Sequence, residues 1–284
     1  MVRYSGKNEE WNENWKERNE AYYTHWTRGK PENQIQLAFR NHWELFQHFM
    51  NSPLHSNGNR SLEVGCGRGS LSAYFSDAGY EATLLDLSPE VIEIAEKIFT
   101  QNNLQATFKV GDAYNLAIDD KSFDVVFSIG VFEHFDEIET PIREQVRVLD
   151  SGGLFIAYVV PEYSQNIQQK FEWINNLLKG YAGAASFESG QHAKSEVFRS
   201  DHGSSHYLPV LEKMGLINLQ AAGVYPLPMI SHSIDFPFSL MPLDSEKHLV
   251  NHLESMLDSN KGYPHRWMCE EGYGNAFVVW GYKP

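Results

Sequence analysis

The chain has 284 residues, 42% of them hydrophobic, which is enough for a packed core and excludes a disordered polypeptide. Its formal net charge of −14 disfavours a nucleic-acid groove, because phosphate binding needs clustered Lys and Arg. Two cysteines, Cys66 and Cys269, give neither a disulfide framework nor a metal quartet. The sequence has no membrane-length apolar run and no signal-peptide pattern at its start. We therefore expect a cytoplasmic protein without membrane or nucleic-acid partners.

The first 55 residues carry aromatic side chains at helical spacing and are expected to be helical. One stripe consists of Trp11, Trp15, Tyr22 and Trp26, and a second of Phe39, Trp43, Phe46 and Met50. Such stripes most often pack against the body of a protein.

Residues 56–160 alternate short apolar runs with amphipathic stretches. The runs expected to be strands are 62–65, 82–86, 107–112, 123–130 and 154–160. Of the helices between them, one is expected to have Ser88 as N-cap and Pro89 as first residue. Another is expected to be capped by Thr140 and to end before Gly152 and Gly153. Strand–helix–strand order predicts a doubly wound α/β fold, whose mostly parallel seven-stranded sheet has helices on both faces.

Two excursions interrupt this pattern, at residues 161–204 and 225–274. The proline-rich part from Pro226 to Pro242 is expected to be a loop, and residues 245–257 a helix. Residues 205–224 and 275–284 are expected to add a helix and strands that complete the sheet. Segments beyond strand ends are where α/β proteins build substrate pockets, so both excursions are expected to form a substrate cap.

A glycine-rich turn follows the first expected strand, with Gly65, Gly67 and Gly69 at alternate positions. Such a turn lets a ligand approach the backbone closely. Carboxylates accompany it: Glu63 precedes the glycines, and Asp86 ends the second strand, where an acid can accept both ribose hydroxyls. Because related turns bind dinucleotides, a nicotinamide-dependent oxidoreductase remains an alternative, although Glu63 and the glycine spacing disfavour it.

These motifs resemble those of the class I S-adenosylmethionine-dependent methyltransferases. Five segments match in order: "EVGCGRG", "LLDLSPE", "GDAYNL", "FDVVFSIGVFEHF" and "LDSGGLFIAY". The resemblance covers about residues 35–160 and the final strands. It implies that Glu63 orients the methionine part of S-adenosylmethionine, Asp86 holds its ribose and Asp112 meets its adenine. The cofactor-binding residues so expected are Glu63, Gly65, Cys66, Gly67, Gly69, Asp86, Leu87, Asp112, Ala113, Ile129 and Gly130.

Candidate catalytic residues follow the fourth strand, in "GVFEHF". A sulfonium methyl is already electrophilic, so a base helps only when the acceptor must lose a proton. His134 is the first candidate base, although a structural or cofactor-facing role is an alternative. Glu133 is ambiguous between packing and substrate contact.

Other candidate residues would contact the substrate. If residues 1–55 form an N-terminal lid, Tyr22, Tyr23 or Trp26 could face the sulfonium or a cationic substrate. His202 is a further candidate. Asp201, His202 and His206 could ligate a metal, but no cysteine or further acidic cluster supports such a site, and we expect none.

The sequence therefore predicts a methyltransferase that moves a methyl group from S-adenosylmethionine to a small-molecule acceptor by in-line displacement. Oxygen or nitrogen is the expected acceptor atom, followed by sulfur. A non-catalytic S-adenosylmethionine-binding protein is a second alternative. The acceptor's identity and the oligomeric state stay open.

Overall fold

The structure is a computed structural model that describes residues 25–56, 58–162, 167–170, 198–228 and 242–284. One sheet runs through these residues, with its strands in the order β3-β2-β1-β4-β5-β8-β6-β7. The strands are β1 (Arg60–Val64), β2 (Glu81–Asp86), β3 (Thr107–Val110), β4 (Phe123–Ile129), β5 (Leu149–Val159), β6 (Ile217–Val224), β7 (Met268–Cys269) and β8 (Ala276–Tyr282).

The five strands β1 to β5 pair in parallel, and β8 inserts antiparallel between β5 and β6. This confirms the doubly wound, mostly parallel sheet. The described sheet has eight strands rather than seven, because the two-residue β7 adds to its edge beside β6. With β8 antiparallel to both neighbours, β6 runs in the direction of β5, so their carboxyl ends reach the same edge as those of β1 to β4.

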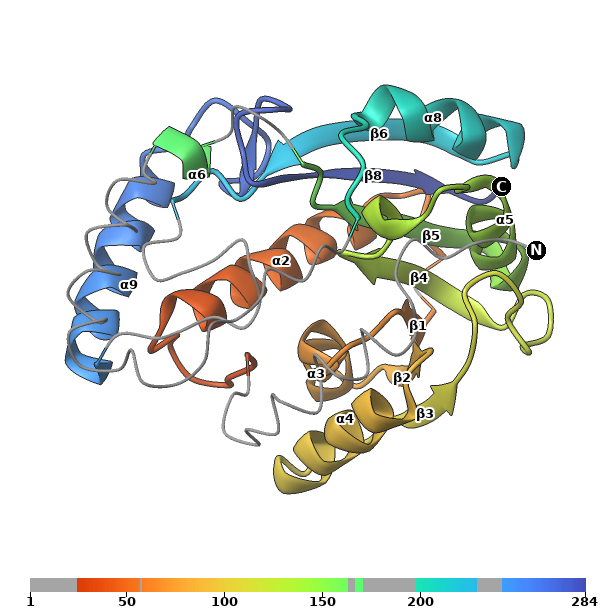
Figure 1. Ribbon diagram of the computed structural model, residues 1–284, viewed down its shortest axis with the longest axis horizontal. Helices are drawn as coiled ribbons and strands as arrows, with labels where there is room; N and C mark the ends of the chain where they lie inside the picture. Colours follow the sequence, from red (N-terminus) through yellow and green to blue (C-terminus); the bar gives the residue numbers. More distant parts are fainter. Residues whose placement is uncertain (1–24, 57, 163–166, 171–197, 229–241) are drawn as a thin grey trace.

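Helices cover both faces of the sheet (Figure 1). One face carries α2 (Gln34–Met50), α3 (Ser70–Asp77) and α4 (Pro89–Gln101), and α9 (Leu243–Asp258) packs beside α2. The other face carries α5 (Glu139–Val148) and α8 (Ser204–Lys213). The short helices η1 (Phe132–His134) and α6 (Ile167–Lys170) follow β4 and β5. The expected helix at residues 245–257 is thus found in α9.

Of the two predicted helix caps, the one at Ser88 is confirmed and the one at Thr140 is wrong. Ser88 is the N-cap of α4, its hydroxyl accepts the N–H of Val91, and Pro89 is the first residue. Thr140, however, lies inside α5, which begins one residue earlier. The carboxylate of Glu137 accepts the N–H of Thr140 at 2.9 Å, so an acid upstream performs the capping. Nor do the two glycines end this helix, since β5 begins at Leu149, directly after it.

The N-terminal region is helical only in part. In α2, Trp43, Phe46 and Met50 are buried, as the second aromatic stripe predicts. Residues 25–33 are not helical, so the expectation that this region is helical is wrong there. This segment is held by polar contacts instead, because Arg40 donates to the carbonyls of Thr27 and Gly29. Residues 1–24 lie outside the described residues, as do parts of both expected cap segments.

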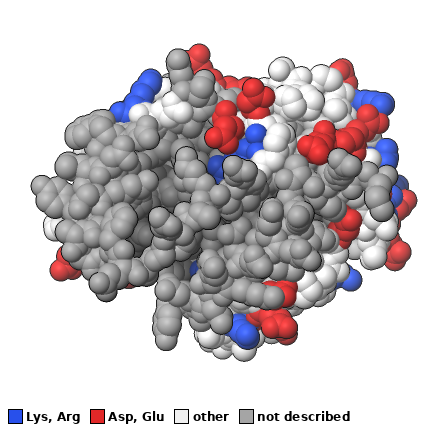
Figure 2. Space-filling view, in the orientation of Figure 1, with Lys and Arg blue, Asp and Glu red and all other residues white. Residues whose placement is uncertain are grey.

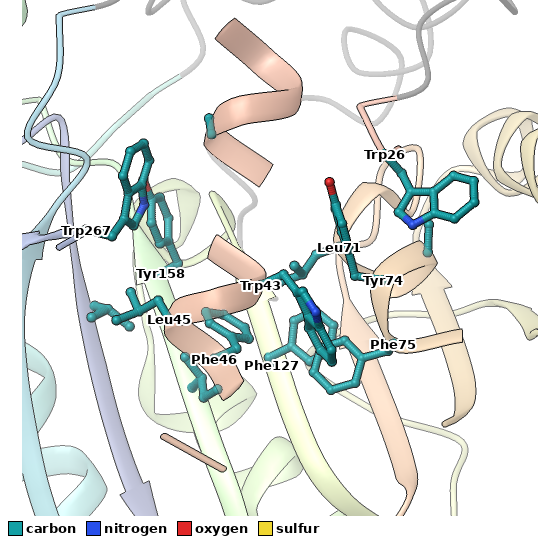
Figure 3. Close-up of a cluster of buried hydrophobic side chains, with 14 of the residues drawn as sticks. Trp26, Trp43, Leu45, Phe46, Leu71, Tyr74, Phe75, Phe127, Tyr158 and Trp267 are labelled. Carbon is teal, nitrogen blue, oxygen red and sulfur yellow. The ribbon is translucent and has the colours of Figure 1, made fainter. Parts of the chain in front are cut away.

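A large aromatic cluster fills the space between α2, α3 and the sheet (Figure 3). Trp43 packs edge-on against Phe75, which stacks on Phe127 of β4 at a centroid distance of 4.8 Å. Tyr158 and Trp267 lie at the β5 and β8 end of this cluster, and Trp26 and Tyr74 at the α3 end. Stacked and edge-to-face rings bury large apolar areas, which fixes α2 against this face of the sheet.

The described surface mixes charges of both signs. On the face shown in Figure 2, Lys and Arg lie scattered among Asp and Glu. Within the described ranges, every helix is too short or too polar to cross a lipid bilayer.

Candidate functional site

The glycine loop lies at the carboxyl edge, between β1 and α3. Gly65 has φ +71°, and a Cβ there would lie 2.5 Å from Cγ2 of Val131. Gly69 has φ +69°, and a Cβ there would lie 2.3 Å from Cδ2 of Leu84. Both positions combine left-handed backbone with no room for a side chain, so only glycine fits. The loop therefore exposes backbone rather than side chains at the start of α3.

Asp86 ends β2 and contacts this loop. One carboxylate oxygen accepts the N–H of Gly67 at 3.0 Å, and the other accepts the N–H of Ser88 at 3.1 Å. Burial nevertheless raises the pKa of this carboxyl. A carboxylate offers about four lone-pair positions, so each oxygen keeps the capacity to accept a further hydrogen bond. Leu87, next in the chain, is half-buried beside it.

Glu63 and Cys66 are buried beneath the loop. Burial raises the pKa of Glu63 to about 8, although its carboxyl accepts both the N–H and the hydroxyl of Ser72 in α3. The carboxyl thus ties β1 to the first turn of α3. The Cys66 thiol is buried, and burial raises its pKa. A protonated buried thiol is a poor nucleophile, consistent with a packing role.

The ends of β3 and β4 complete this edge. Gly111 donates its N–H to the carbonyl of Asp86, which brings the end of β3 beside that of β2. Asp112 accepts the N–H of Tyr114 at 2.9 Å, and Ala113 between them is half-buried. After Ile129, Gly130 has φ +66° and donates its N–H to the carbonyl of Tyr158. The structure thus collects all eleven expected cofactor-binding residues along one edge, at the ends of β1 to β4; their contact with a cofactor stays a prediction.

Glu133 and His134 follow in η1. Glu133 is 1% exposed, and burial raises its pKa to about 7. Burial lowers the pKa of His134 to about 4. Its Nδ1 lies 2.7 Å from the carbonyl oxygen of Phe198, so in the neutral ring Nδ1 carries the proton. Nε2 then lies 3.9 Å from a carboxyl oxygen of Glu133. Near neutral pH, Glu133 is the group able to gain or lose a proton.

The structure describes only two of the four residues that were expected to contact the substrate, Trp26 and His202. Trp26 is 7% exposed and packs edge-on against Tyr74, with the guanidinium of Arg28 5.3 Å from its ring centroid. His202 is exposed and stacks on His206. Tyr22 and Tyr23 lie outside the described residues. Among the residues that are described, no three His, Cys, Asp or Glu are grouped to hold a metal ion.

Several residues at this edge were not predicted from the sequence. His25 is buried and forms a hydrogen bond of 3.0 Å with the hydroxyl of Ser70, directly after the glycine loop. His42, Tyr158, Tyr225 and Trp267 form a ring cluster beside Gly130. Tyr158 alone offered a signal, as a phenol near the carboxyl end of an otherwise apolar strand. The others come from segments far apart in the chain, whose proximity no local pattern encodes.

Comparison with known proteins agrees with this geometry. Residues 62–157 match a family model described as a methyltransferase domain. A ubiquinone biosynthesis O-methyltransferase of Xanthomonas oryzae pv. oryzae is 32% identical over 111 residues, 38% of this chain and 46% of that protein. The ajmaline N-methyltransferase of Rauvolfia serpentina is 36% identical over 98 residues, 34% of each chain. In both cases the matched part spans less than half of the relative's length.

The fold also has a solved counterpart. The crystal structure of a SAM-dependent methyltransferase from Thermotoga maritima superimposes with a TM-score of 0.55 and 15% identity, and it covers 97% of this chain and 99% of its own. At this identity the likeness concerns the fold, which includes the sheet and its carboxyl edge.

Proposed function

We propose that this chain, whose core is a class I S-adenosylmethionine-dependent methyltransferase domain, transfers a methyl group from S-adenosylmethionine to a small-molecule acceptor. The observation that carries the proposal is the contact between Asp86 and the glycine loop. Asp86 holds the N–H of Gly67 while keeping lone pairs for a ligand at the edge where the strands end.

The residues of this edge fit the cofactor. A Cβ at Gly65 would collide with Val131, so the loop carries no side chain there and a methionine part could pack closely against its backbone. Asp86 would accept the ribose hydroxyls, and Asp112 the adenine amine. Glu63 and the backbone of Ile129 and Gly130 would surround the charged end of the methionine part. When bound, S-adenosylmethionine supplies an electrophilic methyl group on a sulfonium, whose bonding electron pair stays with sulfur after transfer.

The chain's own residues then position the acceptor, exclude water and take up a proton. Alignment of a nucleophile in line with the methyl–sulfur bond can contribute about 7–11 kcal/mol in favourable cases. A hydroxyl or ammonium acceptor must also release a proton. Glu133 receives it, because its pKa of about 7 is better matched to neutral pH than the pKa of about 4 of His134. His134 holds the 198–200 segment against η1 through the carbonyl of Phe198.

The acceptor is a small molecule, with oxygen or nitrogen as the favoured atom and sulfur next. In support, the named relatives are an O-methyltransferase of ubiquinone biosynthesis and an ajmaline N-methyltransferase. Residues 161–204 and 225–274 would cap the acceptor, and residues 1–55 would close over the core of residues 56–160. Residues 205–224 and 275–284 complete the sheet.

The test combines binding with turnover. Calorimetric titration with S-adenosylmethionine and with NAD separates the two cofactor classes, and only the first is expected to bind. A panel of hydroxyl, amine and thiol metabolites with methyl-labelled S-adenosylmethionine then reports transfer. Binding without transfer to any acceptor would favour a non-catalytic binding protein, and binding of NAD alone would overturn the proposal.

A further inference from the structure

Four rings meet at the carboxyl edge beside Gly130, and we call them the ring cluster: His42, Tyr158, Tyr225 and Trp267. The centroid of His42 lies 4.6 Å from that of Tyr158 and 5.5 Å from that of Trp267. Tyr225 packs edge-on against Trp267 at 4.7 Å. Because the carbonyl of Tyr158 accepts the N–H of Gly130, the cluster directly adjoins the edge proposed for the cofactor.

The cluster is built from four separate parts of the chain. His42 comes from α2, Tyr158 from the end of β5, Tyr225 from the residue after β6, and Trp267 from the residue before β7. A row of rings leads from it toward the glycine loop, since Phe39 packs edge-on against His42 and stacks on His25. The cluster and the glycine loop therefore lie on the same edge of the sheet, with the cluster on the side of β5 and β6.

Hydrogen bonding fixes the protonation of His42. The indole N–H of Trp267 donates to Nδ1 of His42 at 2.9 Å, so Nδ1 carries no proton. Burial lowers the pKa of His42 to about 3, which keeps the ring neutral near pH 7. The single ring proton is therefore on Nε2, which is a donor. No described residue accepts a hydrogen bond from it.

The two tyrosines also carry hydrogen-bonding capacity that the described chain does not use. Neither the hydroxyl of Tyr158 nor that of Tyr225 bonds to another described residue. Tyr225 in addition has φ +61°, a left-handed backbone that bulky residues rarely adopt. Its carbonyl accepts the N–H of Asn275, and its N–H donates to Trp267, which hold it in this conformation. Strain of this kind is typical of residues held in place at ligand sites.

Two acidic residues act electrostatically on the tyrosines of the cluster. Glu246 is 1% exposed and accepts the N–H of Gln34 at 3.0 Å. Burial is the main cause of the raised pKa of Tyr225, and the charge of Glu246 raises it further. Glu133 contributes in the same way to the raised pKa of Tyr158. A negatively charged ligand group would be repelled here. An ammonium group would face the Nε2–H donor of His42 without a lone pair to accept it.

We infer that the ring cluster is the acceptor subsite, and that the acceptor is an uncharged aromatic ring bearing a hydroxyl group. The ring packs against Tyr158 and Tyr225, beside the buried Trp267. Its hydroxyl oxygen accepts the Nε2–H of His42, and its O–H forms hydrogen bonds with the two tyrosine hydroxyls until Glu133 takes the proton. This inference rests on the proposed function, because it names the substrate class of the same site.

The test uses the full chain saturated with S-adenosylhomocysteine, and isothermal calorimetry with four probes of similar size. These are phenol, cyclohexanol, benzylammonium and benzoate. Phenol is expected to bind most tightly, since cyclohexanol lacks the planar ring and the other two carry charge. Tyr225→Phe and Tyr158→Phe are each expected to weaken phenol binding between about twofold and about twelvefold, the range of one neutral hydrogen bond. Tyr80→Phe is the matched control, because its hydroxyl contacts Sδ of Met50 at 3.3 Å, away from the cluster.

The outcomes separate the two proposals. Failure of S-adenosylhomocysteine to bind would overturn the proposed function and this inference together. Normal binding of that nucleoside with no preference for phenol would overturn the inference alone, and so would equal losses in Tyr225→Phe and Tyr80→Phe. A preference for benzylammonium would replace the phenol class by a cationic one. Unfolding curves for each variant show whether lost binding reflects lost structure.

Discussion

The two halves of the candidate site are built in different ways. The half at β1, β2 and β3 presents backbone atoms and carboxylates that come from short sequence motifs. The half at β5, β6 and α2 presents aromatic side chains from distant segments, such as His42 and Trp267, which are 225 positions apart. A short local motif can bind a cofactor that many enzymes share. An acceptor has to be bound by side chains that only the tertiary structure brings together.

The largest effect is expected at Glu133, where the two halves meet. Glu133→Gln should lower turnover by about 10²–10⁴-fold, the contribution of a positioned general base. The carboxylate form is the active one, so wild-type kcat/KM should rise with pH and level off above about 7. The variant should lack this inflection while S-adenosylhomocysteine still binds. His134→Gln is the comparison, and a larger loss there would transfer the role of base to His134.

The next effect concerns the backbone of the cofactor half. Gly65→Ala combines a left-handed φ with a 2.5 Å approach to Val131, and should cost about 2–5 kcal/mol of folding free energy. Gly79→Ala has φ +88° but open space around the new methyl group, so only the backbone cost of about 1–2 kcal/mol applies. Chemical denaturation measures both. Equal losses would show that the tight packing beside Gly65 is unimportant.

A smaller effect is expected from the ribose acid. Asp86→Asn keeps the side-chain volume but replaces charge-assisted hydrogen bonds by neutral ones, and should weaken S-adenosylhomocysteine binding about tenfold. Asp77→Asn removes a surface carboxylate paired with Arg28 at 2.7 Å and should leave that affinity unchanged. Calorimetry measures the affinity of both variants for S-adenosylhomocysteine. An unaltered affinity in Asp86→Asn would show that Asp86 does not bind the ribose.

A final effect, counted per pH unit, distinguishes the halves by the sign of their pH dependence. Burial raises the pKa of Glu63 from 4.5 to about 8, so the folded state binds the extra proton and Glu63 adds stability as pH falls through this range. Burial lowers the pKa of His42 from 6.5 to about 3, so the unfolded state binds the extra proton and stability is lost as pH falls below 6.5. Each slope is at most about 1.4 kcal/mol per pH unit.

Relative to wild type, Glu63→Gln should therefore become less stable as pH falls from 8 to 5. His42→Gln should become relatively more stable as pH falls from 6 to 4. Urea denaturation at each pH gives both differences. Slopes of the same sign would contradict the assignment of these buried groups.

The same contrast explains what sequence could predict. Ser88 and the glycines at 65, 67 and 69 act within a few residues of themselves, so their roles in caps and turns follow from local rules. Thr140 looked like an equivalent cap, but Glu137 supplies the capping carboxylate, a competition that residue type alone does not settle. His42 and Tyr225 could not be found, because an amphipathic helix and a strand end look alike whether their rings face the core or a ligand.

The central claim is that S-adenosylmethionine lies across the ends of β1 to β4. A crystal structure with S-adenosylhomocysteine tests it most directly. Both ribose hydroxyls are expected within hydrogen-bonding distance of Asp86, and the sulfur between the glycine loop and Tyr158. A nucleoside found elsewhere on the protein, or one whose ribose makes no contact with Asp86, would contradict it.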